Sequence, residues 1–367
     1  MSFYDQYVKL RDISYDENFA NVTDQDVERA LQKEHLNERD YFALLSPAAE
    51  KYLEPMAQKA HQLTKQHFGK TMQLYLPLYL SDYCVNICKY CSFSLDNDFP
   101  RRRLTMDEVE REAQVISDMG IKHILLLSGE SHTHSSIEYL KECLKVLKKH
   151  FSSIGLEIQP LDRDEYEELV AHGIDGLTVY QEVYNEEIYK DIHVKGPKKN
   201  YRYRLDTAER GCQAGMNAVN IGALLGLDDW RKESFITGMH ASYLQNKYLE
   251  ADVGVSFPRI RPHAGSYQPK VDVQDHNLVQ AMLALRLFLP RAAVNVSTRE
   301  SPTLRDHLIP LGVTKMSAAS STEVGGYSEP NETQSQFEIS DERSVAEMKE
   351  VLKQKGYQPV VKDWQMV

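Results

Sequence analysis

Residues 81–93 read Ser81-Asp82-Tyr83-Cys84-Val85-Asn86-Ile87-Cys88-Lys89-Tyr90-Cys91-Ser92-Phe93, directly after an apolar run that ends near residue 80. The three cysteines have the spacing C-x3-C-x2-C. A loop of this kind brings three soft thiolates to one centre, and soft thiolates suit iron–sulfur clusters. A [4Fe-4S] cubane held by three cysteines keeps one iron open for a substrate or cofactor. We therefore interpret Cys84, Cys88 and Cys91 as the ligands of such a cluster.

A structural zinc site and a disulfide are the simpler alternative roles for these cysteines. A structural zinc site usually takes four ligands, and the chain has no second cysteine pair, which leaves His123, His132 or His134 as a fourth ligand. Five cysteines is an odd number, and the N-terminus does not resemble a signal peptide, so disulfide pairing is disfavoured. We rank the cluster above zinc and zinc above a disulfide. Cys143 and Cys212 lie in helix-like segments and are expected to be small core residues.

Composition excludes several classes of function. The chain has 367 residues, of which 42% are hydrophobic and 26% charged, as in soluble globular proteins. No apolar run approaches the roughly 20 residues that span a bilayer. The net charge of −11 argues against a nucleic-acid surface, which needs clustered Lys and Arg. The basic runs at 101–103 and 198–199 are expected to be solvated loops, although either could meet an acidic redox protein. Free thiols and the lack of a targeting segment predict a reducing cytoplasm.

Eight short apolar runs alternate with amphipathic helices and predict the fold. The runs are 74–81, 121–127, 154–159, 175–180, 218–223, 252–258, 293–298 and 313–318. Between the first two, Thr105-Met106-Asp107-Glu108 forms a capping box for a helix that Gly120 ends. Such repetition over about 250 residues predicts an α/β fold, a (β/α)8 TIM-type barrel, at 71–322. We expect a helical extension at 1–70 and a C-terminal tail at 323–367 with one helix near 341–355.

Polar residues follow nearly every predicted strand. In a (β/α)8 barrel the active site lies at the carboxyl ends of the strands. Cys84 follows the first strand, and the other strand ends carry Ser128-Gly129-Glu130, Gln159, Gln181-Glu182, Gly226, Arg259 with Arg261, Arg299-Glu300 and Ser317 to Ser321. We therefore expect one site at this end of the barrel.

The cysteine motif resembles that of the radical S-adenosylmethionine (SAM) enzymes, and further segments narrow the resemblance. These are 78–81, Ser128-Gly129-Glu130, Glu157-Ile158-Gln159-Pro160-Leu161, Val179-Tyr180-Gln181-Glu182, Ile221-Gly222-Ala223-Leu224-Leu225-Gly226-Leu227, Ser256-Phe257-Pro258-Arg259, Ser297-Thr298-Arg299-Glu300-Ser301-Pro302 and Val360-Val361-Lys362-Asp363-Trp364. Together they resemble the aromatic amino-acid lyase branch, and most of all the tyrosine lyases of thiamine biosynthesis, the 2-iminoacetate synthase family. Ser92 departs from the glycine that many relatives have, without affecting ligation.

The resemblance implies cleavage of the Cα–Cβ bond of L-tyrosine. A 5′-deoxyadenosyl radical, made from SAM at the [4Fe-4S] cluster, takes a hydrogen from the substrate amine. The products are p-cresol, 2-iminoacetate (dehydroglycine), 5′-deoxyadenosine and methionine. Thiazole synthase is the implied protein partner, and flavodoxin or ferredoxin the implied electron donor. Because an imine hydrolyses in water, we expect a closed barrel mouth.

The same resemblance implies the SAM contacts. The turn Ser128-Gly129-Glu130 would receive the SAM amino group, with a plain βα loop as the alternative. Arg204 would bind the SAM carboxylate, or be a solvated helical arginine. The remaining contacts would come from Glu157, Gln159, Gly222 and the backbone of Tyr90. Their alternatives are a structural ion pair for Glu157, a strand-ending glycine for Gly222 and core packing for Tyr90.

For the substrate, we expect Arg299 to bind the tyrosine carboxylate, because a carboxylate in a dry barrel needs a charge-assisted contact. A surface arginine is the alternative. Ser317 and Ser320 offer hydroxyls at the next strand end, as substrate contacts or as turn residues. The sequence does not identify the residues around the phenol ring, the oligomeric state or the surface for thiazole synthase.

Three other functions compete with this interpretation. The tyrosine lyase of hydrogenase maturation resembles the barrel but carries a second cluster on C-terminal cysteines, whereas the last cysteine here is Cys212, so we set this alternative aside. A tryptophan-cleaving relative is the second alternative, since the pocket shape decides between phenol and indole. The third, of a different class, is a zinc-stabilised binding barrel without catalysis.

Overall fold

The computed structural model describes residues 2–328 and 333–362. Residues 329–332 of the predicted C-terminal tail, and Asp363 and Trp364 of the C-terminal motif, lie outside the described residues. Within the described ranges, no helix combines the length and apolar character needed to cross a membrane.

The helices are α1 (Phe3–Arg11), α2 (Tyr15–Ala20), α3 (Asp24–Gln32), α4 (Glu38–Leu45), α5 (Leu53–Phe68), α6 (Met106–Asp118), α7 (Ile137–Leu147), α8 (Arg163–Ala171), α9 (Glu186–Ile192), α10 (Tyr201–Leu205), α11 (Thr207–Gln213), α12 (Trp230–Lys247), α13 (Asp275–Phe288), α14 (Pro302–Leu308) and α15 (Val345–Gln354). The strands are β1 (Thr71–Ser81), β2 (Ile87–Cys88), β3 (His123–Ser128), β4 (Ser153–Glu157), β5 (Gly176–Glu182), β6 (His193–Lys195), β7 (Ala218–Ala223), β8 (Asp252–Ser256), β9 (Ala293–Val296), β10 (Lys315–Ser317) and β11 (Gln358–Val360).

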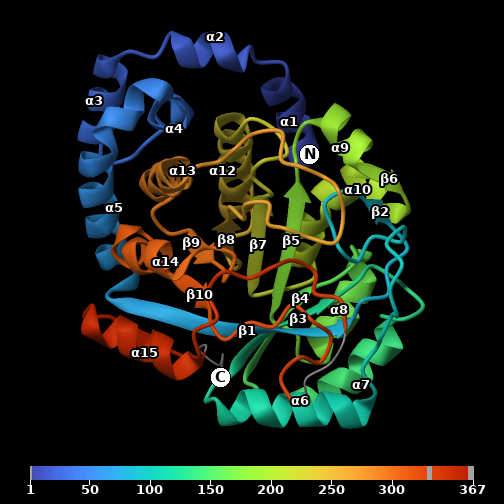
Figure 1. The fold of residues 1–367 in the computed structure, drawn as a ribbon. Helices are drawn as coiled ribbons and strands as arrows, with labels where there is room; N and C mark the ends of the chain where they lie inside the picture. Colours follow the sequence, from blue (N-terminus) through green and yellow to red (C-terminus); the bar gives the residue numbers. More distant parts are fainter. Residues whose placement is uncertain (1, 329–332, 363–367) are drawn as a thin grey trace.

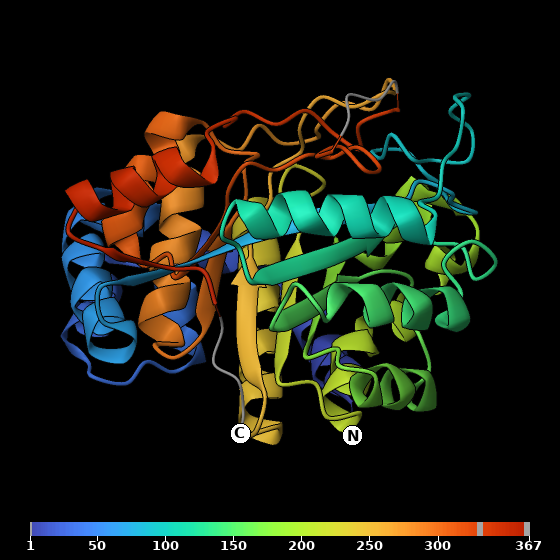
Figure 2. The ribbon, with the colours of Figure 1, turned by 90° about the horizontal axis from the view of Figure 1, so that it is seen from below.

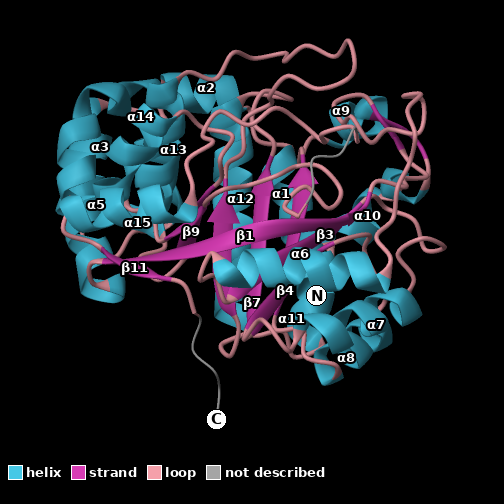
Figure 3. Ribbon diagram, turned by 60° about the horizontal axis from the view of Figure 1, so that its bottom comes forward, coloured by secondary structure: helices cyan, strands magenta, loops and turns pink. Residues whose placement is uncertain are grey.

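Eight parallel strands close into a barrel, as the sequence predicts (Figure 1). Their order is β1-β3-β4-β5-β7-β8-β9-β10, and β10 pairs back with β1 through Leu74 and Met316. Each of the eight predicted runs is one of these strands. The helices lie around the strands (Figure 3). The predicted capping box also forms, because the Thr105 side chain accepts from the backbone N–H of Glu108 at the start of α6. The predicted TIM-type fold is therefore confirmed.

The N-terminal helices pack against the outside of the barrel through aromatic residues. Tyr41 of α4 is fully buried, stacks on Phe288 of α13 at 4.5 Å and donates from its hydroxyl to the Ser234 carbonyl. Gln280 of α13 donates to the carbonyls of Leu44 and Ser46. These contacts join the extension and the barrel into one hydrophobic core.

The chain after β10 runs back across the carboxyl end of the barrel. Gln336 donates its backbone N–H to Thr322, Glu338 to Pro262 and Ser340 to Thr298. The helix predicted near 341–355 is α15, and β11 then pairs in parallel with the start of β1. Figure 2 shows α15, in red, on the side of the blue N-terminal helices. The described residues 318–328 and 333–343 thus form a cover over the mouth of the barrel, and we call them the tail cover.

Candidate active site at the barrel mouth

The cysteine loop leaves β1 at the carboxyl end of the barrel and is held by its own chain. Arg101 donates to the carbonyls of Asp82, Phe93, Ser94 and Asn97. Two residues of the loop, Ile87 and Cys88, form β2, which pairs with β6. The interpretation of 101–103 as a solvated loop is wrong for Arg101, because its half-buried guanidinium donates to four backbone carbonyls.

The three thiols have an environment that suits a bound cluster. Cys88 is buried, and Cys84 and Cys91 are half-buried. Burial raises the pKa of all three thiols, with a further contribution from the Glu130 charge at Cys84 and from the other thiolate charges at Cys88 and Cys91; the pKa of Cys91 reaches about 11. Thiols bind iron as thiolates, and a bound metal centre deprotonates its thiol ligands. In this ligand-free structure, no three His, Cys, Asp or Glu side chains of the described residues converge on one metal position. The donor set nevertheless fits three-cysteine ligation of one cluster.

The zinc alternative gains no support from the histidines. His123 contacts Gln73 and Lys315 at the amino ends of the strands, opposite the cysteine loop. His134 contacts the Ser131 hydroxyl and stacks on Tyr83 at 3.7 Å. His123 therefore lies at the far end of the barrel from the thiols, and the His134 ring already has contacts with Ser131 and Tyr83.

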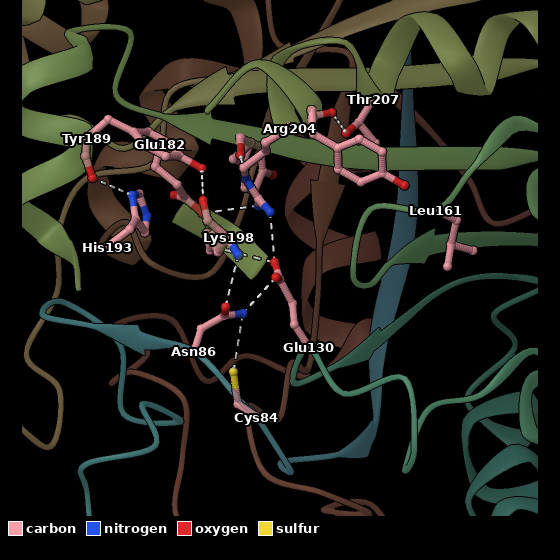
Figure 4. Close-up of polar contacts among 12 residues, drawn as sticks. Cys84, Asn86, Glu130, Leu161, Glu182, Tyr189, His193, Lys198, Arg204 and Thr207 are labelled. Carbon is pink, nitrogen blue, oxygen red and sulfur yellow. Dashed lines mark hydrogen bonds and ion pairs between the residues drawn. The ribbon is translucent and has the colours of Figure 1, made fainter. Parts of the chain in front are cut away.

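Four charged side chains form an ion cluster beside the loop (Figure 4). Arg204 donates from Nη1 to Glu130 Oε1 at 2.7 Å, and its Nη2 lies 3.5 Å from Glu182 Oε1. Lys198 Nζ lies 2.9 Å from Glu182 Oε1 and 3.9 Å from Glu130 Oε1. Every one of the four side chains is at most 12% exposed. We call Glu130, Glu182, Lys198 and Arg204 the mouth ion cluster.

The mouth ion cluster balances two positive and two negative charges. Burial raises the pKa of Glu182. The positive charges of Lys198 and Arg204 lower it by more, so that the net pKa of Glu182 lies below its usual range. Burial lowers the pKa of Arg204, but Glu130 and other neighbours raise it overall. Asn86 links this cluster to the cysteine loop, because its Nδ2 donates to Glu130 Oε2 at 2.7 Å and lies 3.8 Å from Cys84 Sγ. A ligand with both an amino and a carboxylate group would find partners of each charge here.

Backbone conformation positions Glu182 and the Ser128-Gly129-Glu130 turn at the mouth of the barrel. Glu182 ends β5 with φ of 71°, in the left-handed region that is costly for a residue with a Cβ and that gathers at functional sites. Gly129 has no room for a Cβ, which would overlap the carbonyl oxygen of Tyr83 in the cysteine loop. The small residue of the Ser128-Gly129-Glu130 turn therefore lets the turn approach this loop.

A cavity opens inside the barrel next to the mouth. Its lining comes from all sides of the barrel and from the tail cover: Tyr75, Pro77, Tyr79, Leu125, Leu127, Glu157, Tyr180, Ser256, Phe257, Pro258, Leu278, Met282, Asn295, Val296, Ser297, Thr298, Arg299, Glu300, Ser317, Ser320, Thr322, Gln336 and Phe337. Aromatic and aliphatic side chains share this lining with polar and charged ones, among them Glu157, Asn295 and Arg299. Such a lining suits an amphipathic small molecule with an aromatic ring.

Glu157 and Arg299 bring opposite charges to this cavity. Burial raises the pKa of Glu157, and the negative charge of Glu182 raises it further. The Arg299 charge lowers it in part, and the resulting pKa is about 7. Neither side chain makes an ion pair with any described residue. The Arg299 guanidinium lies 3.3 Å from the centre of the Phe337 ring, and Nη1 is 3.5 Å from the Arg259 carbonyl. The alternatives of a structural ion pair for Glu157 and a surface arginine for Arg299 therefore do not hold.

The cavity also contains polar atoms without hydrogen-bond partners. The Ser320 hydroxyl and Asn295 Oδ1 are both buried and unpaired in the described structure. Asn295 Nδ2 donates to Asn220 Oδ1 at 2.6 Å, and Asn220 Nδ2 donates to the Ser256 hydroxyl, which fixes the amide orientations. The Ser317 hydroxyl, in contrast, accepts from the backbone N–H of Thr298. Unpaired buried polar atoms carry a free-energy cost that a ligand can relieve.

The remaining predicted residues lie near the mouth but outside the cavity lining. The Ser128 hydroxyl and Gln159 Oε1 are buried and unpaired, while Gln159 Nε2 donates to the Ser135 carbonyl. The Tyr90 hydroxyl lies 2.8 Å from His193 Nε2. A Cβ at Gly222 would overlap the Ser256 carbonyl oxygen, so glycine there permits the packing of β7 against β8.

Several residues of the site could not be selected from the sequence. Lys198 was expected in a solvated loop, and that expectation is wrong: the side chain is buried because it pairs with Glu182. Arg204 is likewise buried, which excludes the alternative of a solvated helical arginine. Asn86 lies between Cys84 and Cys88, and Asn295 on the seventh barrel strand. The sequence feature that could have identified Asn295 as a site residue is its position as a polar residue within an apolar strand.

Two family profiles match the chain. The Radical SAM superfamily profile matches residues 78–236, and the profile of the Biotin and Thiamin Synthesis associated domain matches residues 256–358. The first range contains the cysteine loop and the mouth ion cluster, and the second contains Arg299 and Asn295. The matched ranges thus cover both parts of the site.

Curated relatives and solved structures agree with the profiles. The 2-iminoacetate synthases of Salmonella typhimurium and Escherichia coli are each 43% identical to this chain over 340 residues, which is 92% of this chain and 90% of theirs. The [FeFe]-hydrogenase maturase HydG from Carboxydothermus hydrogenoformans is 34% identical, with a TM-score of 0.85 over 98% of this chain and 82% of that chain. Methylornithine synthase, at 20% identity and a TM-score of 0.74, shares the fold. The chain therefore belongs to the 2-iminoacetate synthase family of radical SAM enzymes.

Proposed function

We propose that the cavity and the mouth ion cluster together perform the cleavage of L-tyrosine at the Cα–Cβ bond, giving 2-iminoacetate and p-cresol for thiazole formation in thiamine biosynthesis. The observation that carries the assignment is Arg299, a guanidinium without an ion pair among the described residues, in a cavity at the barrel mouth that is lined by both aromatic and polar side chains. A free amino acid with an aromatic side chain matches such a cavity in charge and polarity.

Cys84, Cys88 and Cys91 would hold the [4Fe-4S] cluster, and the turn at Ser128, Gly129 and Glu130 would receive SAM. Glu130 already accepts from Asn86 and Arg204, so its carboxylate is oriented for an ammonium group. Arg204 would meet the SAM carboxylate. The other proposed contacts are Gln159 through its free Oε1, the Tyr90 backbone, and Gly222 through the close packing of its strand.

At the substrate end, Arg299 would bind the tyrosine carboxylate and the free Ser320 hydroxyl would donate to it. Ser317 keeps the backbone at Thr298 in position through its hydrogen bond. At the other end of the substrate, Asn295 Oδ1 would accept from the phenol hydroxyl. Glu157, with a pKa of about 7, lies in the cavity as a carboxyl that can either accept from or donate to the substrate amine near neutral pH.

When bound, the cluster and SAM supply a 5′-deoxyadenosyl radical that removes a hydrogen atom from the tyrosine amine. The chain's own contribution is to orient the amine toward the cysteine loop and to keep water out. Phe337 of the tail cover lies over the Arg299 guanidinium, and the cover closes the mouth above it. Exclusion of water protects both a radical and a hydrolysable imine.

The proposal extends to the parts of the chain and to its surroundings. Residues 71–322 would form the catalytic barrel, with the 1–70 extension and the 323–367 tail as supporting parts. A thiolate-bound cluster needs a reducing compartment, which supports a cytoplasmic location. Thiazole synthase would receive the imine, and flavodoxin or ferredoxin would deliver the electron.

An anaerobic assay tests the function. The reconstituted protein with dithionite, SAM and L-tyrosine should give p-cresol and 5′-deoxyadenosine, and glyoxylate and ammonia from hydrolysis of the imine. Cys88→Ala should lose both the iron and the SAM cleavage. An indole-derived product from L-tryptophan in place of p-cresol would move the chain to the tryptophan-cleaving branch. Full iron content with activity in Cys88→Ala would refute the ligand assignment.

A further inference from the structure

Exposed apolar side chains gather at the outer surface of the cysteine loop. Among the described residues, the exposed large hydrophobic side chains are Val85 (41%), Leu95 (45%), Val194 (45%) and Leu249 (82%). Val85 lies between Cys84 and Asn86, and Leu95 donates its backbone N–H to the Asn86 carbonyl at 2.8 Å. Val85, Leu95 and Val194 therefore lie near one another. Exposed apolar residues on a protein surface are more often scattered singly.

Val194 joins this neighbourhood through the pairing of two short strands. Its neighbours His193 and Lys195 pair with Cys88 and Ile87 of β2. At the next residue, a Cβ on Gly196 would lie 2.8 Å from the Val85 carbonyl oxygen. The segment 193–196 thus runs directly along residues 85–88, and the exposed apolar side chains flank the thiols.

Exposed lysines lie next to Val85, Leu95 and Val194. Lys89, Lys195, Lys199 and Lys270 are exposed, and Asp191 pairs with Lys89 at 2.9 Å. Lys195, Lys199 and Lys270 have no ion pair with any described residue. Asp96 and Asp98, which follow Leu95, are exposed acidic residues near this surface. A local excess of lysine is notable on a chain whose net charge is −11. We call Val85, Leu95, Val194 and these four lysines the cluster-loop face.

We propose that the cluster-loop face is the docking surface for an acidic one-electron carrier protein. This inference rests on the proposed function, since reductive cleavage of SAM needs one external electron. The carrier loses one electron and the cluster held by Cys84, Cys88 and Cys91 gains it; the electron is consumed when the C–S bond of SAM breaks. Redox encounters use small, wet interfaces, and opposite charge speeds their formation. The cluster-loop face, with exposed apolar side chains and lysines next to the cysteine loop, has these properties.

The test uses two acidic carriers, flavodoxin and ferredoxin, and the reconstituted holoenzyme. In the double variant Val194→Asp, Lys195→Glu, the added negative charge should weaken binding of the preferred carrier at least tenfold at low salt. The apparent KM for that carrier should rise by a similar factor. SAM cleavage driven by dithionite should keep the parent rate, because neither residue contacts the cavity or the mouth ion cluster.

Leu249→Asp is the matched control. Leu249 precedes β8, so it lies at the amino ends of the parallel strands, opposite the cysteine loop. This variant should bind the carrier as the parent does. The proposal is overturned if both carriers bind the double variant as tightly as the parent, or if Leu249→Asp weakens binding equally. Because binding is measured without turnover, a parent that binds a carrier but yields no p-cresol would refute the proposed function alone.

Discussion

Glu157 is a carboxyl whose protonation should be visible in the stability of the protein. Burial and Glu182 raise its pKa from 4.5 to about 7. Between these values the folded protein binds more protons than the unfolded chain, so stability falls as pH rises through this window. The loss reaches up to about 3 kcal/mol above pH 7, from 1.36 kcal/mol per pKa unit. Ligand-free Glu157→Gln should lack this loss.

Denaturant unfolding at pH 5 and pH 8 measures the effect. The variant should gain stability relative to the parent at pH 8 and much less at pH 5. Other groups titrate in both proteins, so the difference between parent and variant isolates Glu157. Equal pH dependence in the two proteins would show that the carboxyl is not perturbed in the fold.

Arg299 and Asn295 define the two ends of the substrate and predict different losses. Arg299→Lys keeps the charge but loses the planar fork, so the affinities for tyrosine and phenylalanine should both fall. Asn295→Leu keeps the bulk but removes the acceptor for the phenol. Tyrosine affinity should then fall about tenfold, the equivalent of one hydrogen bond, while phenylalanine affinity stays.

Equilibrium binding of both amino acids to the unreduced, SAM-loaded enzyme separates the two variants, and each serves as the control for the other. If Asn295→Leu lowers both affinities in parallel, Asn295 acts on the shape of the pocket and does not recognise the hydroxyl. Parent-like tyrosine binding by Arg299→Lys would place the carboxylate contact elsewhere.

At the scale of elements, the strands were predictable and the contacts between their ends were not. The eight barrel strands are short apolar runs with capped helices between them, so period and length identify them. Glu130 and Arg204, in contrast, form a pair across 74 positions of the chain. Polar residues at strand ends indicate the mouth of the barrel, but no local pattern tells which of them pair. For this reason Lys198 was expected in solvent.

The turn after β3 and the cysteine loop behave as one unit, because the backbone of Gly129 touches Tyr83. A methyl group at Gly129 would overlap the Tyr83 carbonyl. Gly129→Ala should therefore displace the cysteine loop, cost about 1–3 kcal/mol by overpacking and reduce retained iron. Iron and sulfide analysis after anaerobic reconstitution, with an unfolding curve, measures both effects.

Gly176→Ala provides the comparison for this variant. Gly176 begins β5 at the opposite end of the barrel, and a Cβ there has its nearest atom at 3.7 Å, an ordinary contact. This variant should keep the iron content and the stability of the parent. Normal iron in Gly129→Ala would mean that the loop is held independently of the turn.

At the scale of the molecule, the tail cover and the barrel are held together by a buried charge network. Arg305 of α14 and Asp341 are fully buried and form an ion pair. Arg305 also donates to the Ser317 carbonyl at the end of β10, and Arg343 pairs with both Asp341 and Asp306. The sequence predicted a tail with a helix, but it could not show this network, because the partners are 36 positions apart and none lies in a recognisable motif.

Asp341→Asn tests whether this network keeps the cover in place. Removing one partner of a buried pair leaves the other charge uncompensated, which typically costs about 3–5 kcal/mol. The matched variant Asp306→Asn removes a partly exposed partner of Arg343 and should cost at most about 1 kcal/mol. Chemical unfolding gives both values. Because the cover carries Phe337, which lies on Arg299, amide exchange in 333–343 should rise in Asp341→Asn and tyrosine affinity should fall with it. An equal, small loss in the two variants would mean that the Arg305 charge is compensated by its carbonyl contacts alone, and that the cover is held by its backbone hydrogen bonds.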